Sequence, residues 1–158
     1  MGEFELVIFD CDGVLVDSER IANQVFAQIL NEECGFSLSL QDMFQTFVGH
    51  SSSQCMDIVE SMLGKKPPQG LEERYKDEIN LALRSSVEKV VGIEKAIADI
   101  PFPYCVASSG SHEKMRTTLG STNLLHHFEG LLHSTNEVKR GKPFPDVYLY
   151  AANQMGIT

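Results

Sequence analysis

Two aspartates, Asp10 and Asp12, follow a run of four apolar residues and flank a single cysteine. In an extended chain, residues two apart point the same way, so both carboxylates can face one crevice at the carboxyl end of a strand. Two anions this close repel each other unless a cation or a proton lies between them. Mg²⁺ suits carboxylate oxygens and usually binds together with a phosphate. The pair therefore predicts a Mg²⁺ and phosphate site; alternatively, one aspartate caps the turn at Gly13.

The elements that would position this pair follow from the hydrophobic pattern. Residues 5–9 predict a strand, and their continuous apolar run is typical of a parallel sheet that is covered on both faces. Later in the chain, strands and helices alternate. The predicted elements are a helix at 92–100, a strand at 104–108, a helix at 111–119 capped by Ser111, a weaker strand at 130–134, and a helix that starts near Pro145 and ends at Gly156.

The long stretch between the first strand and this alternation predicts helices only. Four helical segments are expected: Ser18 to Gly35, Met43 to Val48, Ser52 to Gly64 with Ser52 as the cap, and Leu71 to Leu83. The fold class is therefore α/β, with a Rossmann-like parallel sheet core interrupted by a helical insertion. We assign residues 1–15 and 87–158 to the core and residues 16–86 to a helical cap domain.

Composition limits the partners. The 158 residues carry 13 Lys and Arg against 22 Asp and Glu, a net charge of −9, which argues against nucleic acid and anionic membranes as partners. The sequence has no apolar run long enough to span a membrane, and its start lacks the features of a signal peptide. We therefore expect a soluble, cytoplasmic protein. The four cysteines have no paired spacing, which indicates free thiols rather than a zinc site or disulfides.

Three motifs in order resemble those of the haloacid dehalogenase superfamily. "FDCDGVLVDSE" matches every fixed position of that family's signature, DxDG[VT]LxDS. "VASSGS" resembles its second motif, and "RGKPFPDVY" resembles its third, which carries a lysine. The helical insertion resembles the cap of the phosphatase and β-phosphoglucomutase branch. The resemblance spans nearly the whole chain and implies phosphoryl transfer.

The resemblance also implies roles for individual residues. Asp10 would be the nucleophile that forms an aspartyl-phosphate, and Asp12 the general acid and base. Both would hold Mg²⁺, Asp12 through its backbone carbonyl. Ser108 and the Ser109 backbone N–H would bind the phosphoryl oxygens, and Lys142 would neutralise their charge. From the residues alone, the serines could equally form a strand-to-helix turn and Lys142 could be a solvated surface lysine.

His50 is a candidate for substrate recognition, because related enzymes present recognition groups from this part of the cap; the alternative is an ordinary loop before a helix. The predicted activity is Mg²⁺-dependent hydrolysis of small phosphorylated metabolites such as sugar phosphates. The absence of arginine just after Gly49 favours this over a β-phosphoglucomutase-like mutase. A phospho-acceptor module of the receiver type fits less well, because its acids are adjacent and it lacks such an insertion.

The resemblance further calls for a fourth motif, an acidic strand end roughly ten residues after the Pro145 helix. The sequence stops at Thr158 without it. We therefore expect the C-terminal strands of the sheet to be missing, the first strand to lose a neighbour, and the chain to self-associate through that exposed edge. Phosphatase activity of these 158 residues is expected to be weak.

Overall fold

The computed structural model describes residues 4–158. The chain divides into two compact units. One consists of Met1–Ser18 together with Val87–Thr158, and the other of Glu19–Ser86. Each unit has its own hydrophobic cluster and is described by itself.

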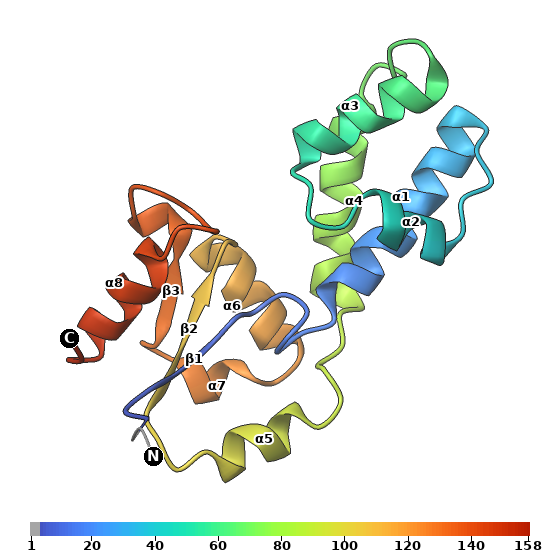
Figure 1. Ribbon diagram of the computed structural model, residues 1–158. Coiled ribbons are helices and arrows are strands. Elements are labelled where there is room, and N and C mark those ends of the chain that lie inside the picture. The colour runs from blue at the N-terminus through green and yellow to red at the C-terminus, as the bar shows by residue number, and fades with distance from the viewer. Residues whose placement is uncertain (1–3) are drawn as a thin grey trace. The chain divides into compact units, whose positions relative to one another are not determined.

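The first unit is built on a parallel sheet of three strands (Figure 1), β1 (Val7–Phe9), β2 (Tyr104–Ser108) and β3 (Leu132–Ser134), in the order β1-β2-β3. Phe9 pairs with Val106, and Ser108 pairs with Ser134, so the carboxyl ends of the strands lie along one edge. This confirms the predicted α/β class with a parallel sheet.

Helices cover both faces of this sheet (Figure 1). They are α6 (His112–Ser121), α7 (Leu125–Phe128) and α8 (Asp146–Gln154). The helix α5 (Ile93–Asp99) precedes β2, and a 3₁₀ turn, η1 (Thr135–Glu137), follows β3. On one face, Val147 and Ala151 of α8 pack against Cys105 and Ala107. On the other, the Phe128 ring of α7 makes edge contacts with aromatic rings of β1 and β2. Alternate residues of β2 thus serve two layers, which explains its unbroken apolar run.

The second unit is entirely helical in Figure 1. Its helices are α1 (Ser18–Cys34), α2 (Leu40–Thr46), α3 (Ser52–Leu63) and α4 (Leu71–Ser85). Phe26 on α1 contacts the rings of Phe47 and Tyr75, with centroids 5.0 and 4.3 Å away, at the centre of the apolar cluster. Gly64 ends α3 at φ 68°, a left-handed conformation that glycine adopts without a Cβ penalty.

Several local predictions need correction. The cap of α3 is Ser51, whose side chain accepts from the Gln54 N–H, rather than Ser52. The first strand is shorter than predicted and only half-buried, because it forms an edge of the sheet in the described part of the chain. The short helix α7 and the turn η1 were not predicted. Ser111 does cap α6, and all four cysteines are free thiols, as predicted.

No helix within residues 4–158 is both long and apolar enough to cross a membrane.

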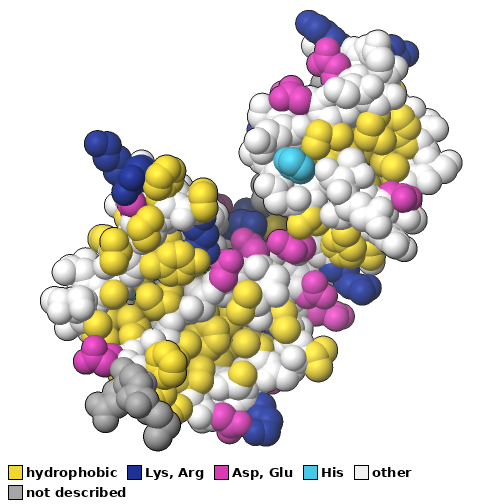
Figure 2. Space-filling view, in the orientation of Figure 1, with side chains coloured by type: hydrophobic (Ala, Val, Ile, Leu, Met, Phe, Trp, Pro, Cys, Tyr) yellow, Lys and Arg dark blue, Asp and Glu magenta, His cyan; other side chains and the backbone are white. Residues whose placement is uncertain are grey.

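Figure 2 shows hydrophobic side chains on the visible face of the sheet-containing unit. Its exposed large hydrophobic residues include Phe4, Phe144 and Leu149, at 74%, 48% and 65% of full exposure. Self-association through the β1 edge stays a prediction.

Candidate active site

The carboxyl edge of the sheet gathers the residues that the sequence singles out. Asp10 follows β1, Ser108 ends β2, and Ser134 ends β3. The loop Ser108–Ser111 leads from β2 into α6, whose first turn faces the same edge. Because the strands are parallel and in register, all these groups come together although they are far apart in sequence.

The Asp10 carboxylate is fixed by one of its two oxygens. Oδ1 accepts the Cys11 backbone N–H at 2.8 Å and lies 3.1 Å from Lys142 Nζ. Oδ2 accepts no hydrogen bond from residues 4–158, and the side chain is 43% exposed. Asp10 thus presents an oriented carboxylate with one open oxygen, as a nucleophile or a cation ligand requires.

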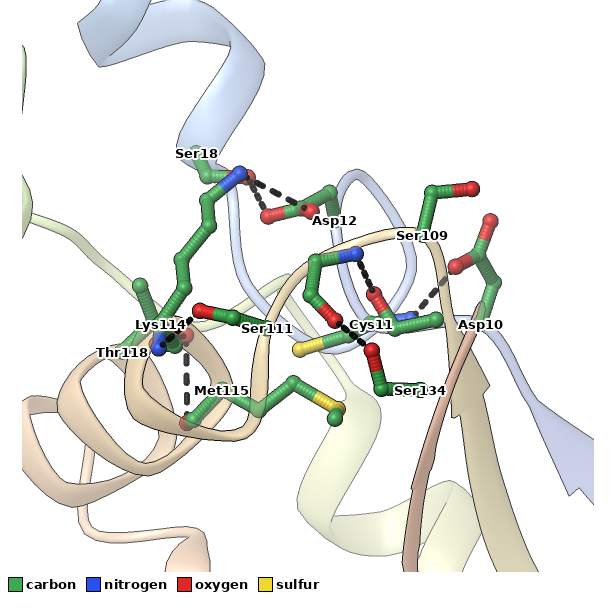
Figure 3. A network of polar contacts seen from close by, with 12 residues as sticks. Asp10, Cys11, Asp12, Ser18, Ser109, Ser111, Lys114, Met115, Thr118 and Ser134 are labelled. Atoms are coloured by element: carbon green, nitrogen blue, oxygen red, sulfur yellow. Dashed lines mark hydrogen bonds and ion pairs between the residues drawn. The ribbon is translucent and has the colours of Figure 1, made fainter. Parts of the chain in front are cut away.

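The Asp12 carboxylate has different partners. Oδ1 accepts the Ser18 hydroxyl at 2.6 Å, and Oδ2 lies 3.1 Å from Lys114 Nζ. Figure 3 shows this carboxylate directed toward Ser18 and Lys114, whereas that of Asp10 points elsewhere. The sequence predicts that both carboxylates point the same way, but this holds only for an extended chain. Here the strand ends at Phe9 and a turn follows. Each anion therefore has a cation of its own.

Cys11, between the two aspartates, is 1% exposed. Burial, reinforced by the negative charge of Asp12, raises the pKa of its thiol to about 12. The thiol is therefore protonated at neutral pH and is a packing group rather than a nucleophile.

The loop after β2 is closely fitted around Gly110. Its N–H donates to Ser108 Oγ at 3.0 Å, and its carbonyl accepts the Ser134 hydroxyl at 2.7 Å. A Cβ at this position would lie 3.3 Å from Ser108 Oγ, 3.4 Å from Lys114 Cδ and 3.7 Å from Asp12 Oδ2. The exposed Ser109 comes just before this glycine, and α6 begins two residues after it. Such a loop at a helix N-terminus can receive an anion.

Lys142 is held firmly. Its Nζ donates to the Ala107 carbonyl at 3.0 Å, pairs with Asp10 and lies 5.1 Å from the centre of the Tyr148 ring. Burial by itself lowers the pKa of Lys142, but hydrogen bonds to Tyr148 and Asp10 outweigh burial, so the pKa lies above its usual value. The ammonium is therefore charged at neutral pH and directed at the Asp10 carboxylate, rather than free in a solvated loop.

His50 lies in the helical unit, exposed in the loop between α2 and α3, with its backbone N–H bonded to the Phe47 carbonyl. Its role in recognition stays a prediction. His133 on β3 is buried, and its Nε2 has no partner in the described part of the chain.

The donors at this edge allow a simple test of fit for Mg²⁺. Within residues 4–158, no group of three or more His, Cys, Asp or Glu side chains could hold a metal ion. Mg²⁺, however, often binds through one or two carboxylates together with waters and substrate phosphate. The open Oδ2 of the half-exposed Asp10 suits that mode of binding.

Comparison with known proteins settles the family. The sequence pattern of haloacid dehalogenase-like hydrolases matches residues 7–158. The chain belongs to this family. It is 33% identical to 6-phosphogluconate phosphatase of Escherichia coli (strain K12), an alignment that covers 99% of this chain and 71% of that enzyme.

Solved structures of haloacid dehalogenase-like proteins agree with this membership. One from Agrobacterium tumefaciens, of unknown function, has a TM-score of 0.90 and 32% identity, over 98% of this chain and 70% of that protein. A family hydrolase from Deinococcus radiodurans, crystallised with phosphate and sodium, has a TM-score of 0.83 and 28% identity, over 98% of this chain and 68% of that protein.

Three residues of the site escaped the sequence analysis. Ser134 could have been found as the last residue of a predicted parallel strand. Lys114 lies in the first turn of α6, the helix that follows the loop Ser108–Ser111, and this position faces the strand ends. Ser18 was expected as a helix start, and its bond to Asp12 carries no signal in the sequence.

Proposed function

We propose that the protein is a Mg²⁺-dependent phosphatase of small phosphorylated sugars that works through an aspartyl-phosphate. The observation that carries this proposal is the Asp10 carboxylate, fixed at Oδ1 by Lys142 and the Cys11 N–H and open at Oδ2, beside the loop Ser108–Ser111. We further propose a cytoplasmic location, as the sequence predicts.

In the first step, a carboxylate oxygen of Asp10 attacks phosphorus, and the bond from phosphorus to the ester oxygen breaks. Asp12 gives a proton to the departing oxygen, so the sugar leaves as a neutral alcohol. Ser108, the Ser109 N–H and Lys142 hold the phosphoryl oxygens while negative charge redistributes among them.

In the second step, water attacks the phosphorus of the aspartyl-phosphate. Asp12, now ionised, takes the proton from this water, and the bond between phosphorus and Asp10 breaks. Inorganic phosphate leaves, and both aspartates return to their starting states. Splitting the displacement into two steps replaces one difficult reaction by two easier ones.

One oxygen of Asp10 and the backbone carbonyl of Asp12 would hold Mg²⁺, which when bound neutralises charge on the phosphoryl group. The open Oδ2 supports this assignment, and Oδ1, beside the Cys11 N–H and Lys142, is then the oxygen that attacks phosphorus.

The substrate class is supported by the relative that acts on 6-phosphogluconate. Hydrolysis is favoured over a mutase reaction because the loop after Gly49 contains His50 and three serines and no arginine to grip a second phosphate. His50 is proposed to contribute to substrate choice from the helical unit.

The test is a screen of phosphorylated sugars and sugar acids with Mg²⁺ and with a chelator, following both inorganic phosphate and isomerised product. Asp10→Asn should lower phosphate release at least about a hundredfold with little change in melting temperature, because the amide cannot accept the phosphoryl group. Isomerised product without phosphate would favour the mutase. Activity of Asp10→Asn close to that of the wild type would refute the nucleophile.

A further inference from the structure

Lys114 makes a contact that the reaction described above does not use. It lies in the first turn of α6, and its Nζ is 3.1 Å from Asp12 Oδ2, across a separation of 102 residues in sequence. Figure 3 shows its side chain extending from the helix to the Asp12 carboxylate, where the Ser18 hydroxyl also arrives. Together, Lys114 and Ser18 occupy one oxygen each.

The fold fixes Lys114 at both ends of its side chain. Its backbone N–H donates to the capping Ser111 hydroxyl at 3.1 Å, and its carbonyl accepts the Thr118 hydroxyl at 3.1 Å. Its aliphatic stem passes Gly110, where an added Cβ would lie 3.4 Å from Lys114 Cδ. The ammonium is thus delivered to Asp12 by a capped helix and a tightly fitted glycine.

Stability does not explain this arrangement. The Lys114 and Asp12 side chains are 40% and 25% exposed, and ion pairs at such sites contribute little to folding. The arrangement instead fixes the orientation of the Asp12 carboxylate. A carboxylate has about four acceptor positions. With one bond to each oxygen, it keeps a position on each for exchanging a proton, while its plane can no longer rotate freely.

We propose that Lys114 is a positioning residue for Asp12, which with Ser18 fixes the carboxylate that exchanges protons with the leaving group. This inference rests on the proposed phosphatase function and adds a residue to it. Lys142 serves Asp10 and Lys114 serves Asp12, so each carboxylate is oriented by its own cation.

The dependence of kcat/KM on the leaving group distinguishes a positioning role of Lys114 from a merely structural one. An alkyl phosphate releases a poor leaving group that needs the proton from Asp12, whereas 4-nitrophenyl phosphate releases a good one that does not. The ratio kcat/KM reports only the steps up to the first irreversible one, transfer to Asp10. Comparing kcat/KM for the two esters therefore isolates proton donation.

The experiment measures kcat/KM for an alkyl and an aryl phosphate in wild type, Lys114→Met, Lys114→Arg and the matched control Arg116→Met. Arg116 lies on the same helix, exposed, and pairs with Glu129. Lys114→Met should lower the value for the alkyl ester about 10- to 100-fold and for the aryl ester less than about threefold. Lys114→Arg should recover part of the loss, and Arg116→Met should match the wild type.

An equal loss on both esters, or no loss on either, would overturn the positioning role. If Lys114→Met melts well below the wild type, Ser18→Ala takes its place, because it removes the other anchor of Asp12 and should show the same bias toward the alkyl ester. Absence of that bias would also overturn the role. Inactivity of the full natural protein on every ester would instead refute the proposed phosphatase.

Discussion

Replacing Lys142 by Met should separate catalysis from stability. The substitution keeps a linear side chain of similar length in a site where the lysine is 20% exposed. It removes the hydrogen bond to the Ala107 carbonyl, the ion pair with Asp10, and the contact with the Tyr148 ring. It also removes a largely buried ammonium.

These changes oppose one another in the free energy of unfolding. The hydrogen bond to Ala107 contributes about 1.5–3 kcal/mol. The pair with the 43% exposed Asp10 adds roughly 0–1 kcal/mol, and the ring contact about 0.5–1 kcal/mol. Desolvation of the ammonium costs several kcal/mol in the other direction. The net change should be within about 2 kcal/mol, which is a shift in melting temperature of less than about 8 °C for a chain of this size.

Catalysis should respond far more strongly, because the proposed reaction places Lys142 beside the phosphoryl group while charge redistributes on it. Losing one such preorganised group typically lowers kcat about 10²- to 10³-fold. Phosphate release at saturating substrate, measured beside a melting curve, gives both values. Lys139→Met, which changes an exposed lysine of the same loop, is the matched control. A loss of less than about threefold in a folded Lys142→Met protein would remove Lys142 from the reaction.

Three further predictions concern the same unit. Gly110→Ala should lower kcat/KM about tenfold with little change in melting temperature, since the added Cβ lies 3.3 Å from Ser108 Oγ and must shift it slightly; kinetics and a melting curve check this. Burial by itself raises the pKa of Glu137, but hydrogen bonds from the Ser134 N–H and His112 outweigh burial, so the pKa is lowered. The Glu137 carboxylate therefore stabilises the fold above about pH 4.5, and this contribution is lost as the pH falls. The melting temperatures of wild type and Glu137→Gln should accordingly converge in acid. Burial lowers the pKa of His133, so the stability of the fold should fall as the pH drops below about 6.5. His133→Phe should remove that fall. It should also add about 1 kcal/mol to the free energy of unfolding in urea at neutral pH, because no unpaired Nε2 remains.

Much of this unit could be predicted from sequence because its signals are local. The apolar run at 104–108 and the capping serine at 111 predicted β2 and the start of α6, since strand and cap chemistry depend on neighbouring residues. The family resemblance of the three motifs singled out Asp10, Ser108 and Lys142, which lie at the carboxyl edge of the sheet.

What escaped prediction depends on side-chain direction and on long-range contact. The turn after Phe9 directs Asp12 toward Ser18 and Lys114, and no periodicity indicates that a residue 102 positions away supplies its cation. The burial of His133 likewise follows from the packing of α8 on the sheet, which places Tyr150 against its ring.

The most direct measurement is to identify the covalent intermediate. Protein mixed with a radiolabelled sugar phosphate is quenched in acid, where acyl phosphates persist, and the labelled peptide is mapped by mass spectrometry. We expect the label on Asp10, removable by hydroxylamine and absent from Asp10→Asn. Turnover of substrate with no labelled protein under rapid quench, or a label on any other residue, would contradict the aspartyl-phosphate mechanism.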